Sequence, residues 1–203
     1  MGRMPLPQDV LTLVVEDAAA WRAWLDANES VSDGVWLVLA KKGTTVPTSL
    51  SYAQALEAAL CSGWIDGQKQ SLDDATFVQR FTPRRVRSLW SQRNVQLVSQ
   101  LTEAGAMRAR GMAEVDRAKA DGRWERAYAG PATAVVPDDL AAALAASPSA
   151  RARFEALSSA QRFSILHPLM TATTDAVRAR RLAKALDALT DSPRSGSTGA
   201  IAG

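Results

Sequence analysis

The stretch WIDGQKQSLDDATFVQRF, residues 64–81, decides the fold class of this chain. Its two ends, WIDGQKQ (64–70) and TFVQRF (76–81), are typical of β-strands, and the SLDDA between them is rich in turn-forming residues. Pro83 follows two residues later and is expected to stop the second strand, because proline has no N–H to donate to a ladder. We therefore predict a hairpin over residues 64–81 that belongs to a small sheet.

Upstream of this hairpin, the sequence predicts two more strands and two capped helices. LTLVV (11–15) is a short strand candidate, and VWLVLA (35–40) is a continuous apolar run of the kind found in buried strands. Asp17 is placed to cap the first helix. Ser51 and Gln54 form the capping-box pattern that opens the second helix. The sheet should therefore be covered by helices.

Downstream, the pattern turns to helices alone. Ser88 is expected to cap a long helix, and residues 137–190 are rich in alanine and predict further helices. The fold class that follows is α+β: a small, mainly antiparallel sheet covered by helices, followed by a C-terminal helical segment. We expect an α+β domain over 1–130, a helical segment over 131–190, and a disordered Gly/Ser-rich tail over 191–203.

Composition narrows the class of protein. The chain has 203 residues, of which 47% are hydrophobic and 22% charged, and its net charge is +3. That profile is ordinary for a folded domain, and so mild a charge does not by itself imply nucleic-acid binding. Cys61 is the one cysteine, so no internal disulfide forms. Since no leader pattern or long apolar run is present, we expect a cytoplasmic protein without a membrane span.

Positive charge is concentrated in RFTPRRVRSLWSQRN, residues 80–94, which holds five arginines and no carboxylate. Several of them surround the helix start expected at Ser88, where free N–H groups favour an anion. Arg84 is the arginine that we expect to point inward. A solvated or ion-paired surface explains the same charge equally well.

Two indoles and a polar set near these arginines suggest a cleft. Trp64 and Trp90 would form its walls, although core packing is the ordinary role of each indole alone. Asp66 would point to the same face as Trp64, and a structural cross-strand ion pair with Arg80 is the plainer interpretation. The expected ligand-binding set is Trp64, Asp66, Lys69, Arg80, Arg84, Ser88, Trp90, Ser91 and Asn94.

Ordered motifs through the first two thirds of the chain resemble the YdeI/OmpD-associated family, also called bacteriocin-protection proteins. The matching motifs are Trp36, Lys41-Lys42, Ala59-Leu60-Cys61, Gly63-Trp64-Ile65-Asp66-Gly67, Gln79-Arg80-Phe81, Thr82-Pro83-Arg84, Ser88, Trp90-Ser91, Asn94, Gly105-Ala106-Met107, Gly111, Ala118-Lys119 and Gly122-Arg123-Trp124. The resemblance spans about residues 20–130 and is looser beyond. It implies protection against antimicrobial peptides or association with a porin, and it names no chemistry.

Two positions depart from the pattern that the resemblance implies. Ser62 stands where a larger aromatic residue is expected, which would leave room beside Trp64. His167-Pro168, followed by TATTD, interrupts what should be a more continuous C-terminal helix. A changed pocket floor and a re-angled last helix are therefore expected.

Several chemistries are disfavoured by residue content. One histidine and one cysteine do not make a usual zinc site, and neither a phosphate loop nor a dinucleotide fingerprint is present, so no cofactor is expected. His167 is best interpreted as a structural histidine and Cys61 as an inert core thiol. Asp66 is the remaining acid–base candidate.

Three hypotheses about function follow. The favoured one is a binding or protection protein that holds a small anionic or aromatic compound, or a peptide, in the Trp/Arg cleft. The alternative is an enzyme, for example one for a tailoring step in a biosynthetic pathway, in which Asp66 is catalytic and Arg84 holds the substrate. A nucleic-acid binder using residues 80–93 is the weakest, because acidic residues soon follow that stretch. Nothing in the sequence indicates an oligomeric state.

Overall fold

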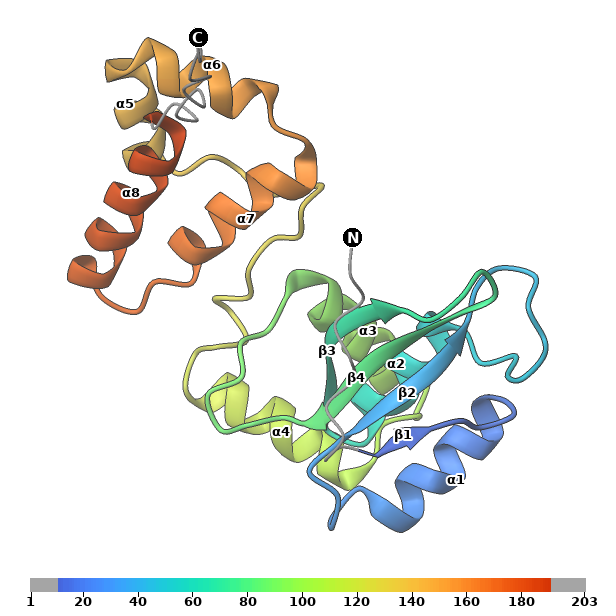
Figure 1. Cartoon of the computed structure of the whole chain (residues 1–203). Helices are drawn as coiled ribbons and strands as arrows, with labels where there is room; N and C mark the ends of the chain where they lie inside the picture. The colour runs from blue at the N-terminus through green and yellow to red at the C-terminus, as the bar shows by residue number, and fades with distance from the viewer. Residues whose placement is uncertain (1–10, 191–203) are drawn as a thin grey trace, which may run out of the picture. The chain divides into compact units, whose positions relative to one another are not determined.

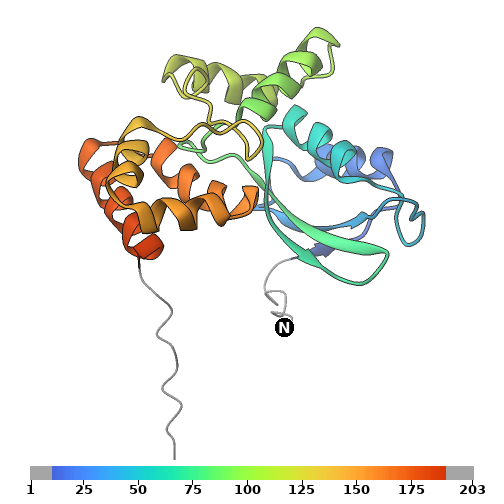
Figure 2. The ribbon, with the colours of Figure 1, turned by 90° about the horizontal axis from the view of Figure 1, so that it is seen from above.

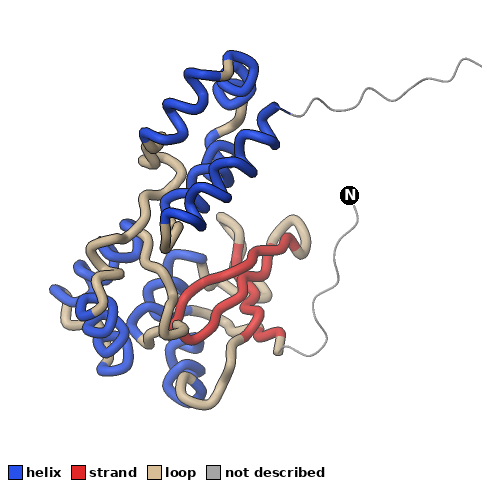
Figure 3. Tube along the Cα trace, turned by 90° about the vertical axis from the view of Figure 1, so that its left-hand side faces the viewer, coloured by secondary structure: helices blue, strands red, loops and turns tan. Residues whose placement is uncertain are grey.

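The computed structural model describes residues 11–190 as two compact units, one ending at Ala127 and one beginning at Tyr128 (Figure 1). The tail predicted over 191–203 lies outside the described residues. Strands occur only in the first unit of this described part, as Figure 3 shows. The α+β class with a helical C-terminal segment is confirmed.

A four-stranded mixed sheet forms the centre of the first unit. Its strands are β1 (Thr12–Leu13), β2 (Val35–Ala40), β3 (Trp64–Ser71) and β4 (Thr76–Pro83), in the order β1-β2-β4-β3. β1 runs parallel to β2, and the other neighbours are antiparallel. The hairpin predicted over 64–81 is therefore confirmed. The buried strand predicted over 35–40 is confirmed too, because every residue of β2 is buried.

Helices of the first unit lie on one side of this sheet (Figure 2). They are α1 (Ala18–Asn28), α2 (Tyr52–Cys61), α3 (Gln92–Glu103) and α4 (Ala109–Ala120). Asp17 caps α1 and the Ser51–Gln54 capping box opens α2, both as predicted. The main core cluster joins α1 and α2 to the sheet through Trp21, Leu25, Ala55, Ala58, Ala59, Val35, Leu37, Leu39, Trp64, Phe77 and Phe81.

The start of α3 corrects one prediction. Ser91, not Ser88, is its N-cap, and the Ser91 hydroxyl accepts a hydrogen bond from the Asn94 N–H at 3.2 Å. The Ser88 hydroxyl instead accepts from the Arg85 N–H at 2.9 Å and closes a turn. Both serines suit a cap by residue type, and the local turn decides between them. Trp90 therefore precedes the helix and does not lie on it.

The second unit consists of four helices with their own core. These are α5 (Asp138–Ala146), α6 (Pro148–Ala156), α7 (Ser159–Met170) and α8 (Asp175–Thr190). Starts at Ser147-Pro148 and at the Ser158–Gln161 capping box occur as predicted. The buried core residues are Leu140, Leu144, Ala150, Phe154, Leu166, Leu169 and Leu189. None of the helices described in residues 11–190 is long and apolar enough to cross a membrane.

Candidate functional site

Trp64 is a core residue in the structure. Its side chain is fully buried and packs edge-on against Trp24, with ring centres 5.8 Å apart. The indole Nε1 donates to the Glu29 carbonyl at 3.3 Å. Next to it in the sequence, the Ser62 side chain is buried, and its hydroxyl accepts from Arg108 Nη1 at 3.0 Å. A ligand therefore has no exposed face of Trp64 to contact.

Asp66 does not form the cross-strand pair that was suggested for it. The register places Asp66 opposite Phe81, and its Oδ2 accepts a hydrogen bond from the Tyr52 hydroxyl at 2.8 Å. Residues opposite one another share a face of the sheet, so Arg80, one position along, points to the other face. Arg80 Nη2 lies 3.4 Å from the Asp33 carbonyl. A register irregularity between Asp66 and Lys69 accompanies this pairing.

Burial and the contact with Asp66 both keep the proton on Tyr52. Burial first, and then the Asp66 charge and hydrogen bond, raise the pKa of Tyr52 well above its ordinary value. The Arg93 guanidinium lies 5.4 Å from the centre of the Tyr52 ring and acts in the opposite direction. Tyr52 is therefore a hydrogen-bond donor to Asp66 across the neutral pH range.

Arg84 and Trp90 form a buried stack. The guanidinium carbon of Arg84 lies 3.5 Å from the Trp90 ring centre, and its Nη1 donates to the Leu89 carbonyl at 3.2 Å. Trp124 packs on Trp90 with ring centres 4.8 Å apart. Arg84 is 6% exposed and Trp90 2% exposed. This stack ties the loop before α3 to the body of the unit, since cation–π contacts strengthen when desolvated.

The remaining predicted residues are scattered around these groups. Lys69 Nζ lies 4.1 Å from the Phe77 ring centre, and Asn94 is buried on α3. Trp64 and Trp90 belong to two different core clusters. The structure therefore brings together Arg84 with Trp90 and Ser91 with Asn94, but neither the two indoles with each other nor Asp66 with Arg80.

Three arginines of the same stretch lie at the surface. Arg85, Arg87 and Arg93 are exposed, and within residues 11–190 none of them has a carboxylate within 4.0 Å. Arg93 also lines a hollow of about 240 Å³ between α2 and α3. The other lining residues are Ala53, Leu56, Glu57, Gln96, Leu97 and Gln100. We call this hollow and its arginine the Arg93 site.

Sequence reasoning missed the groups that complete this region. Tyr52 carried no signal that pointed to Asp66, because the two meet only through packing of α2 on β3. The lining of the hollow had a usable signal: Arg93, Gln96, Leu97 and Gln100 follow helical spacing of three and four. In the described part of the chain, no group of three histidine, cysteine or carboxylate side chains could hold a metal ion.

Comparison with known families assigns a match to each unit. Residues 13–114, half of the chain, match the family model described as "Domain of unknown function (DUF8412)", and residues 133–191 match the one described as "Bacteriocin-protection, YdeI or OmpD-Associated". Neither the curated proteins nor the solved structures gave a match. The second model confirms the family that the sequence indicated, at residues beyond most of the motifs quoted for it.

Proposed function

The chain belongs to the family DUF8412 and carries a bacteriocin-protection, YdeI or OmpD-associated domain at residues 133–191, and from this premise we propose that it is a binding protein of the protection type. It holds a small anionic or aromatic compound, or a peptide with such groups, and withdraws it from its target. The lone, buried thiol of Cys61 suits a reducing compartment such as the cytoplasm.

The Arg93 site is the observation that carries this proposal. Arg93 is exposed and lacks a carboxylate partner among the described residues, so its charge is open to an anion. Its planar fork suits a carboxylate with two parallel bonds. Leu56 and Leu97 line the adjoining hollow and would receive an apolar group.

Polar residues in the same hollow favour a peptide-like ligand. Gln96 and Gln100 offer both amide donors and acceptors. Glu57 lies on the wall of the hollow as well, so the lining carries both signs of charge. A ligand with a carboxylate and an N–H donor satisfies this lining better than a bare polyanion does.

Arg84 acts in this proposal on the loop before α3, without contacting a ligand. Its stack on Trp90 and its bond to the Leu89 carbonyl hold the loop that carries Arg85 and Arg87. Fixing this loop in the free protein lowers the ordering cost of binding. Arg84 is therefore a positioning residue in this proposal.

Calorimetry with matched arginine variants tests the proposal. The probes are a compound that co-purifies with the protein, identified by mass spectrometry, and N-acetylphenylalanine with its carboxamide as the uncharged control. Arg93→Gln should weaken binding of the acid by about 1.5–3 kcal/mol, the range for a charged hydrogen bond. Arg126→Gln removes an exposed arginine that does not line the hollow, and should change affinity by roughly 0–1 kcal/mol.

Equal small losses of affinity for both variants would mean that the acid responds to diffuse surface charge. That result would contradict the proposed Arg93 site. The same titrations separate the two alternatives. Turnover of the bound compound, abolished by Asp66→Asn, would indicate an enzyme. Affinity for nucleic acid that drops steeply from low to physiological salt would indicate a nucleic-acid binder.

A further inference from the structure

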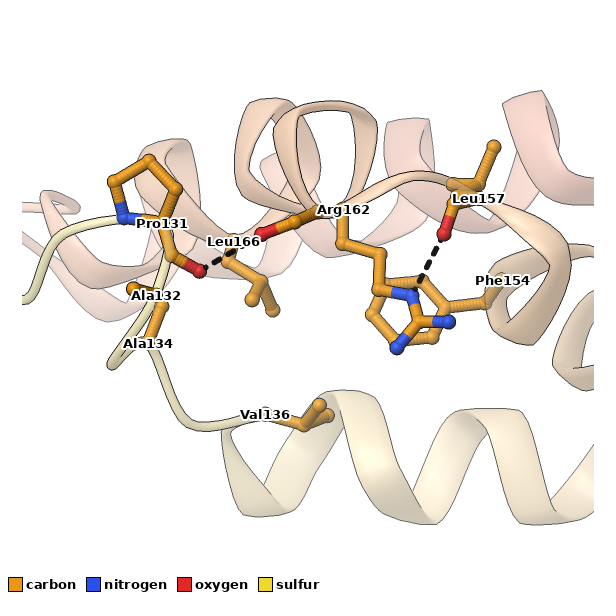
Figure 4. Close-up of a pocket in the computed structure, with 9 residues that line it drawn as sticks. Pro131, Ala132, Ala134, Val136, Phe154, Leu157, Arg162 and Leu166 are labelled. Atoms are coloured by element: carbon orange, nitrogen blue, oxygen red, sulfur yellow. Dashed lines mark hydrogen bonds between the residues drawn. The ribbon is translucent and has the colours of Figure 1, made fainter.

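The second unit contains a pocket that the proposed function does not use. Its volume is about 390 Å³, within the range of small-molecule sites. Figure 4 shows it between the chain segment 131–136 and the corner where α6 passes into α7. The lining residues are Pro131, Ala132, Ala134, Val136, Phe154, Leu157, Ser159, Arg162 and Leu166. All of them belong to the second unit.

Most of the wall is apolar. Ala134 and Val136 line one side, while Phe154, Leu157 and Leu166 line the other (Figure 4). Phe154 and Leu166 are themselves buried core residues, so the floor of the pocket is part of the packed unit. Such a surface favours the apolar body of a ligand, because its burial removes apolar area from water.

Arg162 is a cation held in place on this apolar wall. Its Nε donates to the Leu157 carbonyl at 3.0 Å, and its Nη2 donates to the Glu155 carbonyl. Its guanidinium carbon lies 5.9 Å from the centre of the Phe154 ring. These contacts fix the guanidinium plane before any ligand arrives, which reduces the ordering cost of binding.

The charge of Arg162 has no counter-charge nearby. In the described chain, no carboxylate lies within 4.0 Å of it, and the Glu155 carboxylate is paired with Arg151 at 2.8 Å instead. Nη1 of Arg162 has no hydrogen-bond partner among the described residues, so both of its N–H groups remain available to an acceptor. An acceptor with negative charge would satisfy both.

The opposite wall is tied to the same helix. The Ser159 hydroxyl, at the start of α7, donates to the Pro131 carbonyl at 3.1 Å. This bond holds the segment 131–136 beside Arg162 and gives the pocket a defined width. The hydrogen bonds of Arg162 and of Ser159 therefore hold two walls of the pocket in place.

We propose that this pocket binds a small monocarboxylate with an apolar body, such as an arylalkanoic acid. The carboxylate accepts from Arg162 Nη1, and the apolar body lies against Val136, Phe154 and Leu166. A monoanion fits better than a phosphate, because Arg162 is the one charged residue among the described residues that line the pocket. This inference is independent of the Arg93 site, which lies in the first unit.

Titration of the full chain with phenylacetate, and with phenylacetamide as its uncharged isostere, tests the proposal. The acid should bind more tightly than the amide. Arg162→Gln should weaken the acid roughly 10- to 100-fold and abolish the preference, as expected for loss of a charged hydrogen bond. Arg180→Gln, an exposed arginine on α8, removes the same charge elsewhere in the unit and should leave both affinities within about twofold.

A second variant keeps the test valid if Arg162→Gln disturbs the α6–α7 corner. Ala132 is exposed at the rim, so Ala132→Trp should obstruct the pocket and weaken both probes while the melting temperature stays unchanged. All of these titrations are repeated in an Arg93→Gln background, which removes the carboxylate contact of the Arg93 site. The proposal would be overturned by any of three results. The acid and the amide could bind equally well, or Arg162→Gln and Ala132→Trp could both leave phenylacetate binding intact. Phenylacetate could also fail to bind at millimolar concentration.

Discussion

At the scale of residues, the degree of burial distinguishes arginines that look alike in sequence. Arg84 is almost wholly buried on Trp90, whereas Arg93, on the first turn of α3, is exposed. Arg162 is intermediate: it is held by two carbonyls yet keeps donors toward a pocket. The same guanidinium therefore stabilises a loop in one place and offers an anion contact in another.

His167 makes the stability of the second unit depend on pH. Its ring packs edge-on against Tyr128, with centres 4.6 Å apart, and lies 5.4 Å from the Phe163 ring. Burial, and secondarily the charge of Arg181, lower the pKa of His167. The unfolded chain, with an ordinary histidine pKa of about 6.5, then binds a proton more readily than the folded one. Stability is therefore full above that pH and decreases as pH falls below it.

Urea denaturation at neutral pH and near pH 5, on the wild type and His167→Phe, measures this effect. The wild type should lose stability over that interval, and the variant should lose clearly less. Asp139 titrates lower, because its bond to Arg178 lowers its pKa, so it does not obscure the comparison. An equal acid-induced loss in both proteins would contradict the assignment to His167.

At the scale of elements, the close approach of α4 to the end of α2 depends on one glycine. A Cβ on Gly111 would lie 2.3 Å from the Cys61 carbonyl oxygen and 2.8 Å from the Leu60 carbonyl oxygen. Both contacts are to backbone, so neither atom can turn aside. The absence of a side chain at Gly111 thus decides how closely the two helices pack.

Gly111→Ala should destabilise the first unit by about 1–3 kcal/mol, as overpacking does. In an exposed helix the same change would stabilise by roughly 1 kcal/mol, so the sign of the effect is diagnostic. Gly130→Ala is the matched control, because no atom lies within 4 Å of its added Cβ. It should shift the free energy of unfolding by less than about 1 kcal/mol in urea denaturation. A stabilising Gly111→Ala would show that the helices have room to separate.

At the scale of the whole molecule, two cores correspond to two family matches. The model matching residues 13–114 falls in the first unit and the one matching 133–191 in the second. The second unit has its own buried leucine-rich cluster and a two-bond pair between Arg178 and Asp139, at 2.7 and 2.8 Å. We therefore propose that the chain comprises two domains that fold independently.

The fragments 1–127 and 128–203 test this proposal. Each should unfold cooperatively by circular dichroism, and the spectrum of fragment 128–203 should show helix without strand, since its regular elements in the described residues are α5–α8. Leu169→Asp within that fragment should abolish its transition, because it buries an unpaired charge in a core position that is fully buried. A fragment 128–203 without a cooperative transition would mean that the second unit needs the first.

The sequence by itself determined most of the elements, although it misplaced the start of α3. The hairpin over 64–81, the buried strand 35–40, the caps at Asp17 and Ser51, and the helix starts at Pro148 and Ser158 were all predicted correctly. These features depend on residues within a few positions of one another, such as a hydroxyl three residues from the N–H that it accepts from. Local signals of that kind lie within a short stretch of the chain, so they can be identified without the tertiary structure.

Only the tertiary structure decided what those elements present to a ligand. Asp66 bonds to Tyr52 and not to Arg80 because strand register, set by packing of the whole sheet, assigns the faces. The hollow at Arg93 needs α2 beside α3, and the pocket at Arg162 needs the segment 131–136 beside α7. Each of these sites joins residues distant along the chain, and their meeting depends on side-chain packing that no local pattern encodes.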